Sequence, residues 1–267
     1  MTEIVLKYDN KEEVIEIADS WNSLSPEQLL YVGEYWESWK LLAENDESLL
    51  KVKALLFLEL MKGNTKANRK HRIDLIAQAN SVMQQQLTEL TTFIFRDNKL
   101  TKCPIACISG LSTKLCGPND GLGNITVFEF AFADSLFMNY SSSGDIALLE
   151  KLIAILYRPK FLEKRVAFDK DKVEKYLPLI KKMPYAEKQL ILLWYNGCRK
   201  QIIADHRNLF SSEEHKEAKS EGWLPVILAL AGDKFGTFDE TGHTDLHVIF
   251  MELKALKKRV PKKKRRK

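Results

Sequence analysis

Three capping boxes mark helix starts along this chain. A capping box is a Ser or Thr followed three residues later by Glu or Gln, directly before an apolar run. The pattern occurs at Ser25–Gln28, where Pro26 follows the cap, at Thr126–Glu129 and at Ser211–Glu214. In each box the two side chains satisfy backbone N–H groups that a helix N-terminus leaves unpaired. Three such starts constrain the chain to a largely helical fold.

Apolar residues recur at helical spacing after these starts, and Gly or Pro residues interrupt them. The predicted helices cover residues 26–39, 49–61, 73–95, 126–143, 148–157, 169–182, 184–208, 211–231 and 244–257. The helix over 211–231 either runs without a break to Ala231 or is split in two by Pro225. We expect large apolar side chains on the helix stripes to form the core, namely Trp36, Phe128, Phe137, Leu152, Leu156, Trp194 and Trp223.

Two segments depart from the helical pattern. Glu3–Tyr8 (EIVLKY) alternates and is the one good strand candidate. Residues 97–125 are rich in Gly, Cys, Pro, Ser and Asn and are too long for an ordinary connector, so they form a functional loop or a small irregular hairpin. The sequence therefore predicts a mainly α, multi-helix globular fold. Its helical regions, 1–96 and 126–256, form one body or two lobes around the loop at 97–125.

Positive charge is concentrated at the C-terminus. Of the 41 basic residues, nine lie in 257–267, which leaves 32 in residues 1–256 against all 36 acidic residues. We expect this polybasic tail to be disordered, because its charges repel one another and little apolar surface offsets the entropy of ordering. The tail is either only solvated or binds nucleic acid, an anionic membrane or an acidic partner. The candidate anion-binding residues are Lys257, Lys258, Arg259, Lys262, Lys263, Lys264, Arg265, Arg266 and Lys267.

Cysteine usage and hydropathy indicate a soluble protein with reduced thiols and no membrane insertion. The four cysteines are too sparse for a disulfide scaffold, and the longest apolar run, Leu224–Ala231, is far shorter than a membrane span. Cys103 and Cys107 have the spacing of a zinc knuckle, but Cys116 lacks a close second partner. We therefore expect buried cysteines, no bound metal, and no disulfide between Cys103 and Cys107.

Catalytic signatures are missing from the sequence. It contains no P-loop, no G-x-G-x-x-G, no H-E-x-x-H and no G-x-S-x-G motif. We expect a non-enzymatic protein without a cofactor. The catalytic alternative is a pocket around the Gly-rich loop, drawing on Asp120, Asn124, Arg158 and Arg199.

Arginine and histidine residues that follow apolar stretches are expected to be structural. Arg158, Arg165 and Arg199 are predicted at helix C-termini, where each can pair with an acid of a neighbouring helix. His243 and His247 are four residues apart, but we interpret this segment as a helix start capped by Thr244, with an acidic residue in its first turn.

Several segments together resemble a known group of proteins. They are SWNSLSPEQLLYVGEYW, CGPNDGLGNITVFEFAFADSLFMNY, LLEKLIAILYRP, WYNGCR and GWLPVILALAGDKFG, within residues 20–250. In this order they resemble a poorly characterised group encoded among the tail and virion-assembly genes of phages and prophages of Bacteroidota-type bacteria. Residues 126–159 also resemble the helical region of tail-assembly chaperones, which couple the tape-measure protein to tail-tube subunits.

The resemblance implies a helical assembly factor or virion component of the phage tail, acting in the host bacterial cytoplasm or in the virion. Its partner would be the tape-measure or tube protein. The aromatic residues of the segment are the candidate partner-binding residues: Phe128, Phe132, Phe137 and Tyr140. The alternative function is nucleic-acid binding through the polybasic tail.

Overall fold

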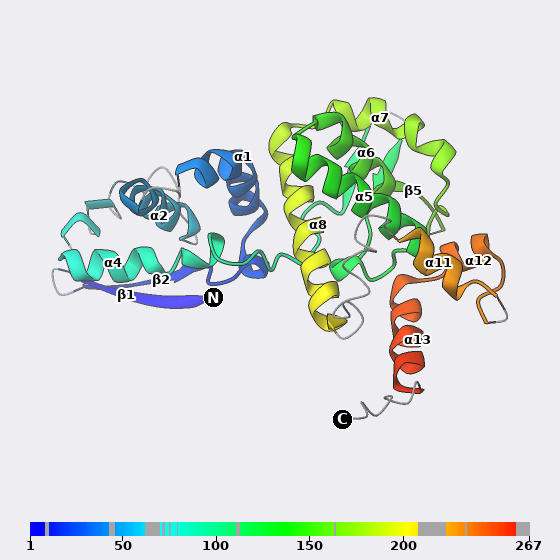
Figure 1. Cartoon of the computed structure of the whole chain (residues 1–267). Helices are drawn as coiled ribbons and strands as arrows, with labels where there is room; N and C mark the ends of the chain where they lie inside the picture. Colours follow the sequence, from blue (N-terminus) through cyan, green and yellow to red (C-terminus); the bar gives the residue numbers. More distant parts are fainter. Residues whose placement is uncertain are drawn as a thin grey trace, which may run out of the picture. The chain divides into compact units, whose positions relative to one another are not determined.

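The computed structural model describes residues 1–8, 11–42, 46–61, 70, 73–74, 76–78, 80–110, 113–162, 164–207, 223–232 and 234–259. They divide into two compact units. Unit 1 comprises residues 1–104 and 184–197, and unit 2 comprises residues 105–183 and 198–267. Helices dominate both units (Figure 1), which confirms the prediction of a mainly α, multi-helix fold.

Unit 1 combines a β-hairpin with helices. Its strands are β1 (Thr2–Tyr8) and β2 (Lys11–Ile17), and its helices are η1 (Trp21–Ser23), α1 (Pro26–Leu42), α2 (Asp46–Leu60), α4 (Ser81–Glu89), η2 (Thr92–Ile94) and the first part of α8 (Tyr185–Asp205). The two strands pair antiparallel from Thr2 opposite Ile17 to Tyr8 opposite Lys11. Charged residues in KEEVIEI obscured β2 in the sequence, although its buried side chains, Ile15 and Ile17, alternate as a strand requires.

The first capping box forms as predicted. The Ser25 N–H donates to Gln28 Oε1 at 2.9 Å, and the Gln28 N–H donates to Ser25 Oγ at 3.3 Å. Helix α1 then starts at Pro26. The box over Ser211–Glu214 lies outside the described residues.

The first part of α8 belongs to unit 1 although it follows unit 2 segments in the chain. Trp194 is fully buried, and its indole N–H donates to the Thr101 carbonyl at 3.0 Å. A Cβ at Gly197 would lie 2.3 Å from the Leu100 carbonyl oxygen, so only glycine allows this approach. The first part of α8 therefore belongs to unit 1 because it packs closely against residues 98–101.

Unit 2 packs helices against a four-stranded antiparallel sheet. The strands, in spatial order, are β3 (Cys107–Ser109), β4 (Lys114–Cys116), β5 (Arg158–Phe161) and β6 (Lys164–Arg165). The helices are η3 (Asp120–Leu122), α5 (Val127–Ser143), α6 (Ile146–Leu156), η4 (Lys170–Lys172), α7 (Val173–Lys181), the end of α8, α11 (Leu224–Leu230), α12 (Phe238–His243) and α13 (Leu246–Arg259). Figure 1 shows α5, α6 and α7 gathered beside β5.

The sheet decides between two alternatives and corrects one expectation. Part of the segment 97–125 forms the β3–β4 hairpin, one of the two alternatives left open by the sequence. Arg158 is not at a helix C-terminus, because α6 ends at Leu156 and Tyr157 is already extended. Pro159 accounts for this, since the residue before a proline is pushed out of the helical region.

The hairpin also corrects the expectation of reduced thiols. Cys107 and Cys116 are cross-strand partners and form a disulfide, in which neither Cys103 nor Cys198 takes part. The register of β3 and β4 brings the two thiols together, and cysteine spacing alone did not indicate it.

The predicted core residues are not all equally buried. Phe128, Leu152, Leu156 and Trp194 are buried, whereas Trp36, Phe137 and Trp223 are half-buried. A further correction concerns the gap between the predicted helices over 211–231 and 244–257, because this gap contains the short helix α12. No helix in the described part of the chain is long and apolar enough to cross a membrane.

Candidate functional site

Glu129 anchors the most unusual polar cluster of unit 2. It lies in the first turn of α5, where its Oε2 accepts the Thr126 N–H at 2.9 Å and its own N–H donates to Thr126 Oγ1 at 3.3 Å. This confirms the second predicted capping box. Unlike most capping glutamates, Glu129 is fully buried. A buried carboxylate requires positive partners.

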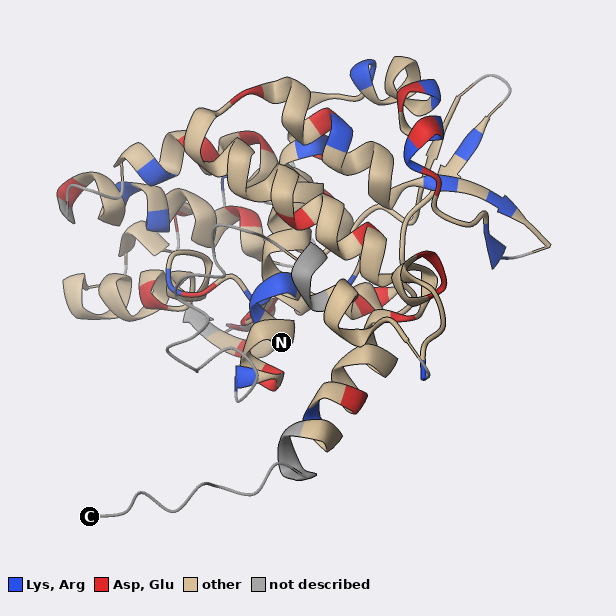
Figure 2. Cartoon of the chain, turned by 45° about the vertical axis from the view of Figure 1, so that its right-hand side comes forward, with Lys and Arg blue, Asp and Glu red and all other residues tan. Residues whose placement is uncertain are grey.

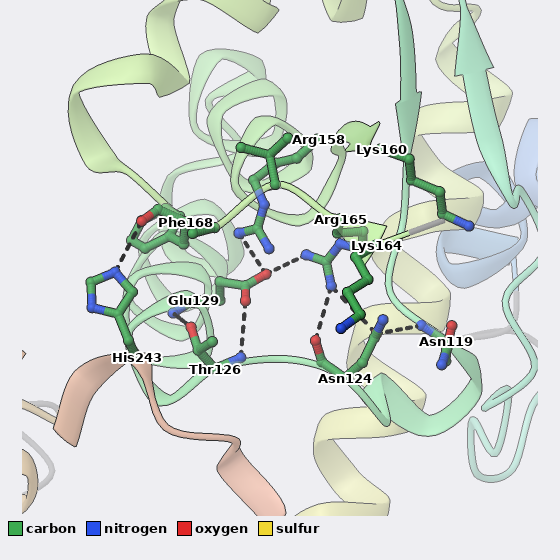
Figure 3. Close-up of a pocket in the computed structure, with 12 residues that line it drawn as sticks. Asn119, Asn124, Thr126, Glu129, Arg158, Lys160, Lys164, Arg165, Phe168 and His243 are labelled. Carbon is green, nitrogen blue, oxygen red and sulfur yellow. Dashed lines mark hydrogen bonds and ion pairs between the residues drawn. The ribbon is translucent and has the colours of Figure 1, made fainter. Parts of the chain in front are cut away.

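Two arginines from the neighbouring hairpin supply that charge. Arg158 Nη1, from β5, lies 2.7 Å from Glu129 Oε1, and Arg165, from β6, forms an ion pair and hydrogen bond with the same oxygen. Figure 3 shows the two guanidinium groups approaching Glu129 from different directions. The expectation that these arginines pair with an acid on a neighbouring helix is confirmed, but strands rather than helix ends hold them.

The cluster contains more positive than negative charge. Both arginine side chains are almost fully buried, and they share one carboxylate. Burial lowers the pKa of the Arg165 guanidinium, and the charge of Glu129 opposes that shift. Nε of each arginine is buried without a hydrogen-bond acceptor in the described part of the chain, and Arg158 Nη1 is close to Glu129 but misaligned for a hydrogen bond. The buried donors are therefore incompletely compensated.

A cavity of about 400 Å³ adjoins this cluster. Its described lining includes polar and basic side chains from four segments: Asn119, Asn124, Thr126, Glu129, Arg158, Lys160, Lys164, Arg165 and His243, together with Val166, Ala167 and Phe168. Such a volume is typical of small-molecule sites. Figure 3 shows His243 on one side of Glu129 and Asn124 and Lys164 beside Arg165 on the other.

His243 closes one side of the cavity. Its Nδ1 lies 2.9 Å from the Asp239 carbonyl oxygen, and its Nε2 lies 3.1 Å from the Phe168 carbonyl oxygen. Burial alone would lower the pKa of His243, but these two acceptors, followed by the charge of Asp239, raise it above its ordinary value. Only the protonated ring donates to both carbonyls.

The two histidines do not act as a pair on one helix. His243 ends α12, whereas His247 lies in α13, with its Nε2 3.3 Å from the Leu122 carbonyl oxygen. Asp245 caps α13 by accepting the His247 N–H at 2.8 Å, so the predicted cap at Thr244 is wrong by one residue. No group of three or more His, Cys, Asp or Glu residues that could hold a metal ion occurs among the described residues.

Arg199 belongs to a different cluster. It forms an ion pair and hydrogen bond with Asp134 of α5, and the Trp223 indole N–H donates to the other oxygen of Asp134 at 3.0 Å. Of the residues in the catalytic alternative, Asn124 and Arg158 line the cavity, whereas Asp120 and Arg199 do not.

The predicted partner-binding aromatics differ in burial. Phe128 is buried, with its ring centroid 5.3 Å from that of Phe238, and Phe132 packs 5.6 Å from Phe168. Phe132, Phe137 and Tyr140 are half-buried. Their role in partner binding stays a prediction. In the polybasic tail, residues 257–259 belong to α13, and residues 260–267 lie outside the described residues.

Sequence reasoning missed Glu129, Lys160 and Lys164 as parts of one site. Their signal was weak: the stretch RPKFLEKR has basic residues on both sides of an apolar pair, as an amphipathic hairpin would. The four described strands of the sheet contain five basic residues and no acidic one, and Figure 2 shows this basic sheet at its right-hand edge.

Comparisons with protein-family models, with curated proteins and with solved structures found no match to this chain.

Proposed function

We propose that this chain is a non-enzymatic binding protein that acts in the assembly of phage tails. The tip of the β5–β6 hairpin carries the proposal. Phe161 and Leu162 lie side by side there and are 74% and 81% exposed. Leu162 also has a φ of 46°, a conformation that non-glycine residues rarely adopt. Adjacent large apolar side chains held in water on a strained turn are typical of a contact point for a partner.

The proposed role in phage-tail assembly rests on the resemblance of the sequence to tail and virion-assembly proteins. The proposed partner is the tape-measure protein, a long amphipathic helix, or a tail-tube subunit. The apolar stripe of such a helix could cover the hairpin tip. Phe128 is less suited to this role because it is buried, so Phe132, Phe137 and Tyr140 are at most secondary contacts. The contact would form in the host bacterial cytoplasm during assembly or persist in the virion.

Co-expression with the tape-measure and tube proteins of the parent phage tests this proposal. The double substitution Phe161→Ser, Leu162→Ser removes the apolar tip without touching the core. We expect the wild type to co-purify with one of these proteins and the double variant to lose it. Leu41→Ser, Leu42→Ser is the matched control, because these adjacent leucines of α1 are 73% and 44% exposed. Equal binding by all three proteins, or by none, would contradict the proposal.

Nucleic-acid binding through the polybasic tail is the second candidate, favoured by the segregation of nine basic residues into 257–267. Contact with Z phosphates of duplex DNA gives a slope of about −0.9Z when log affinity is plotted against log salt. Deleting residues 257–267 should abolish this binding and leave the thermal midpoint of unfolding nearly unchanged. Salt-independent binding, or binding that survives the deletion, would exclude this function.

A further inference from the structure

The cavity beside Glu129 has an excess of positive charge that the described fold does not neutralise. Arg158, Lys160, Lys164 and Arg165 contribute four cations to its lining, and Glu129 is the one acid among its described lining residues. At Glu129, Oε1 contacts both guanidinium groups and Oε2 accepts a backbone N–H. Both oxygens of the carboxylate are therefore already engaged by groups other than the two lysines.

The backbone holds part of this charge in a defined arrangement. Lys160 and Arg165 are cross-strand partners in the β5–β6 hairpin, so their side chains leave the sheet on the same face. Arg158 is two residues before Lys160 in β5 and shares that face. The ion pairs with Glu129 fix the two guanidiniums, while the lysine ammonium groups extend from exposed positions.

Hydrogen bonds connect Arg165 to Asn124, and Asn124 to Asn119, in another part of the cavity lining. The Arg165 guanidinium donates to the Asn124 backbone carbonyl at 3.2 Å, and Asn124 Oδ1 accepts the Asn119 N–H at 2.8 Å. These bonds orient the Asn124 amide beside Arg165 (Figure 3). Guanidinium groups, ammonium groups and amides are donors that proteins use to bind phosphate oxygens.

We propose that this cavity binds a small organic phosphomonoester. The phosphate would lie beside Lys160, with the charges of Arg158 and Arg165 behind it, while Lys164, which follows the other face of the hairpin, also contributes to the cavity lining. A volume of about 400 Å³ exceeds what inorganic phosphate needs, and Val166, Ala167 and Phe168 give the remaining space an apolar wall. The ligand therefore carries an organic part of metabolite size in addition to its phosphate.

Isothermal titration of the full-length chain tests the proposal with four probes: inorganic phosphate, sulfate, a panel of sugar phosphates and nucleoside monophosphates, and a single-stranded oligonucleotide. We expect at least one phosphomonoester to bind more tightly than inorganic phosphate and sulfate. The substitution pair Lys160→Gln, Lys164→Gln should weaken that binding about tenfold or more, because each lysine contributes a charge-assisted hydrogen bond. Both lysines are exposed, so the thermal midpoint should be unchanged.

The control is Lys170→Gln, Lys175→Gln, which removes the same charge from exposed positions of η4 and α7. It should bind the phosphomonoester like the wild type, which separates the cavity from general attraction by the polybasic tail. An equal loss in both double variants would overturn the proposal. So would the absence of phosphomonoester binding at millimolar concentration, binding no tighter than that of inorganic phosphate, or binding of the oligonucleotide alone.

Discussion

Two capping boxes in unit 2 have the same local hydrogen bonds, but their glutamates differ in burial and in their charged partners. At Thr126–Glu129 and at Thr237–Glu240, a threonine accepts the N–H of the glutamate, which accepts the threonine N–H at 2.9 and 2.7 Å. Glu240 is exposed, and hydrogen bonds with the backbone and side chain of Thr237 lower its pKa. Glu129 is fully buried between two arginines.

The difference teaches that one motif can serve two energetic roles. The exposed box satisfies helix N–H groups and contributes little more, because water solvates its carboxylate. The buried box performs the same local task and also supplies the counter-charge for a hairpin distant in sequence, since Arg165 is 36 residues from Glu129. Removal of a buried charge leaves its partners uncompensated, whereas loss of an exposed charge does not.

The largest expected effect is the difference in unfolding free energy between variants of the two glutamates. Glu129→Gln retains the shape and the capping oxygen but leaves two buried guanidiniums without a counter-ion. We expect a loss of about 3–5 kcal/mol in the free energy of unfolding. Glu240→Gln should cost much less, since water solvates this carboxylate and only the local cap changes. Urea denaturation of the two variants and the wild type measures both losses, and similar losses would show that burial of Glu129 carries no special cost.

A smaller effect concerns the threonines, where the two boxes should behave alike. Thr126→Ala and Thr237→Ala each remove the oxygen that accepts the glutamate N–H. We expect each to cost about 1 kcal/mol of unfolding free energy, because the lost hydrogen bond is local in both. Measured by the same denaturation, a much larger loss at Thr126 would mean that the threonine also positions Glu129 against the arginines.

The smallest expected effect is a pH dependence of stability, which arises from His243 at the end of α12. The pKa of His243 is raised in the folded state, so its protonation stabilises the fold. That stabilisation is complete below the unfolded pKa of about 6.5 and is lost as the pH rises through the higher folded pKa. The stability difference between the wild type and His243→Gln should therefore be largest near pH 5 and shrink towards pH 8. A difference that grows with pH would contradict the raised pKa.

Much of the helical fold could be predicted because its signals are local. The boxes at Ser25 and Thr126 form as expected, and α8 lies within the predicted range 184–208. The sheet of unit 2 was missed because its strands are two to four residues long, too short for a period of two to be recognised. The disulfide between Cys107 and Cys116 depends on that sheet and was missed with it.

The candidate site could be predicted only in fragments. Sequence reasoning named Asn124 and Arg158 for a pocket and expected the arginines to pair with acids. It could not identify Glu129 as the acid, because capping explains that residue completely at the local level. Nor could it exclude Arg199, which lies beside Asp134 in a separate cluster.

By itself, the sequence determined the helix starts at Ser25 and Thr126 and where the excess of positive charge lies, because capping and charge depend on residues close together in the chain. Only the tertiary structure decided that Glu129 is buried while Glu240 is exposed. It also decided that Arg158 and Arg165 meet at one carboxylate and that the first part of α8 belongs to unit 1. The physical reason is that burial and ion pairing depend on which distant segments pack together. Two capping boxes with the same threonine and glutamate carry no information about that choice.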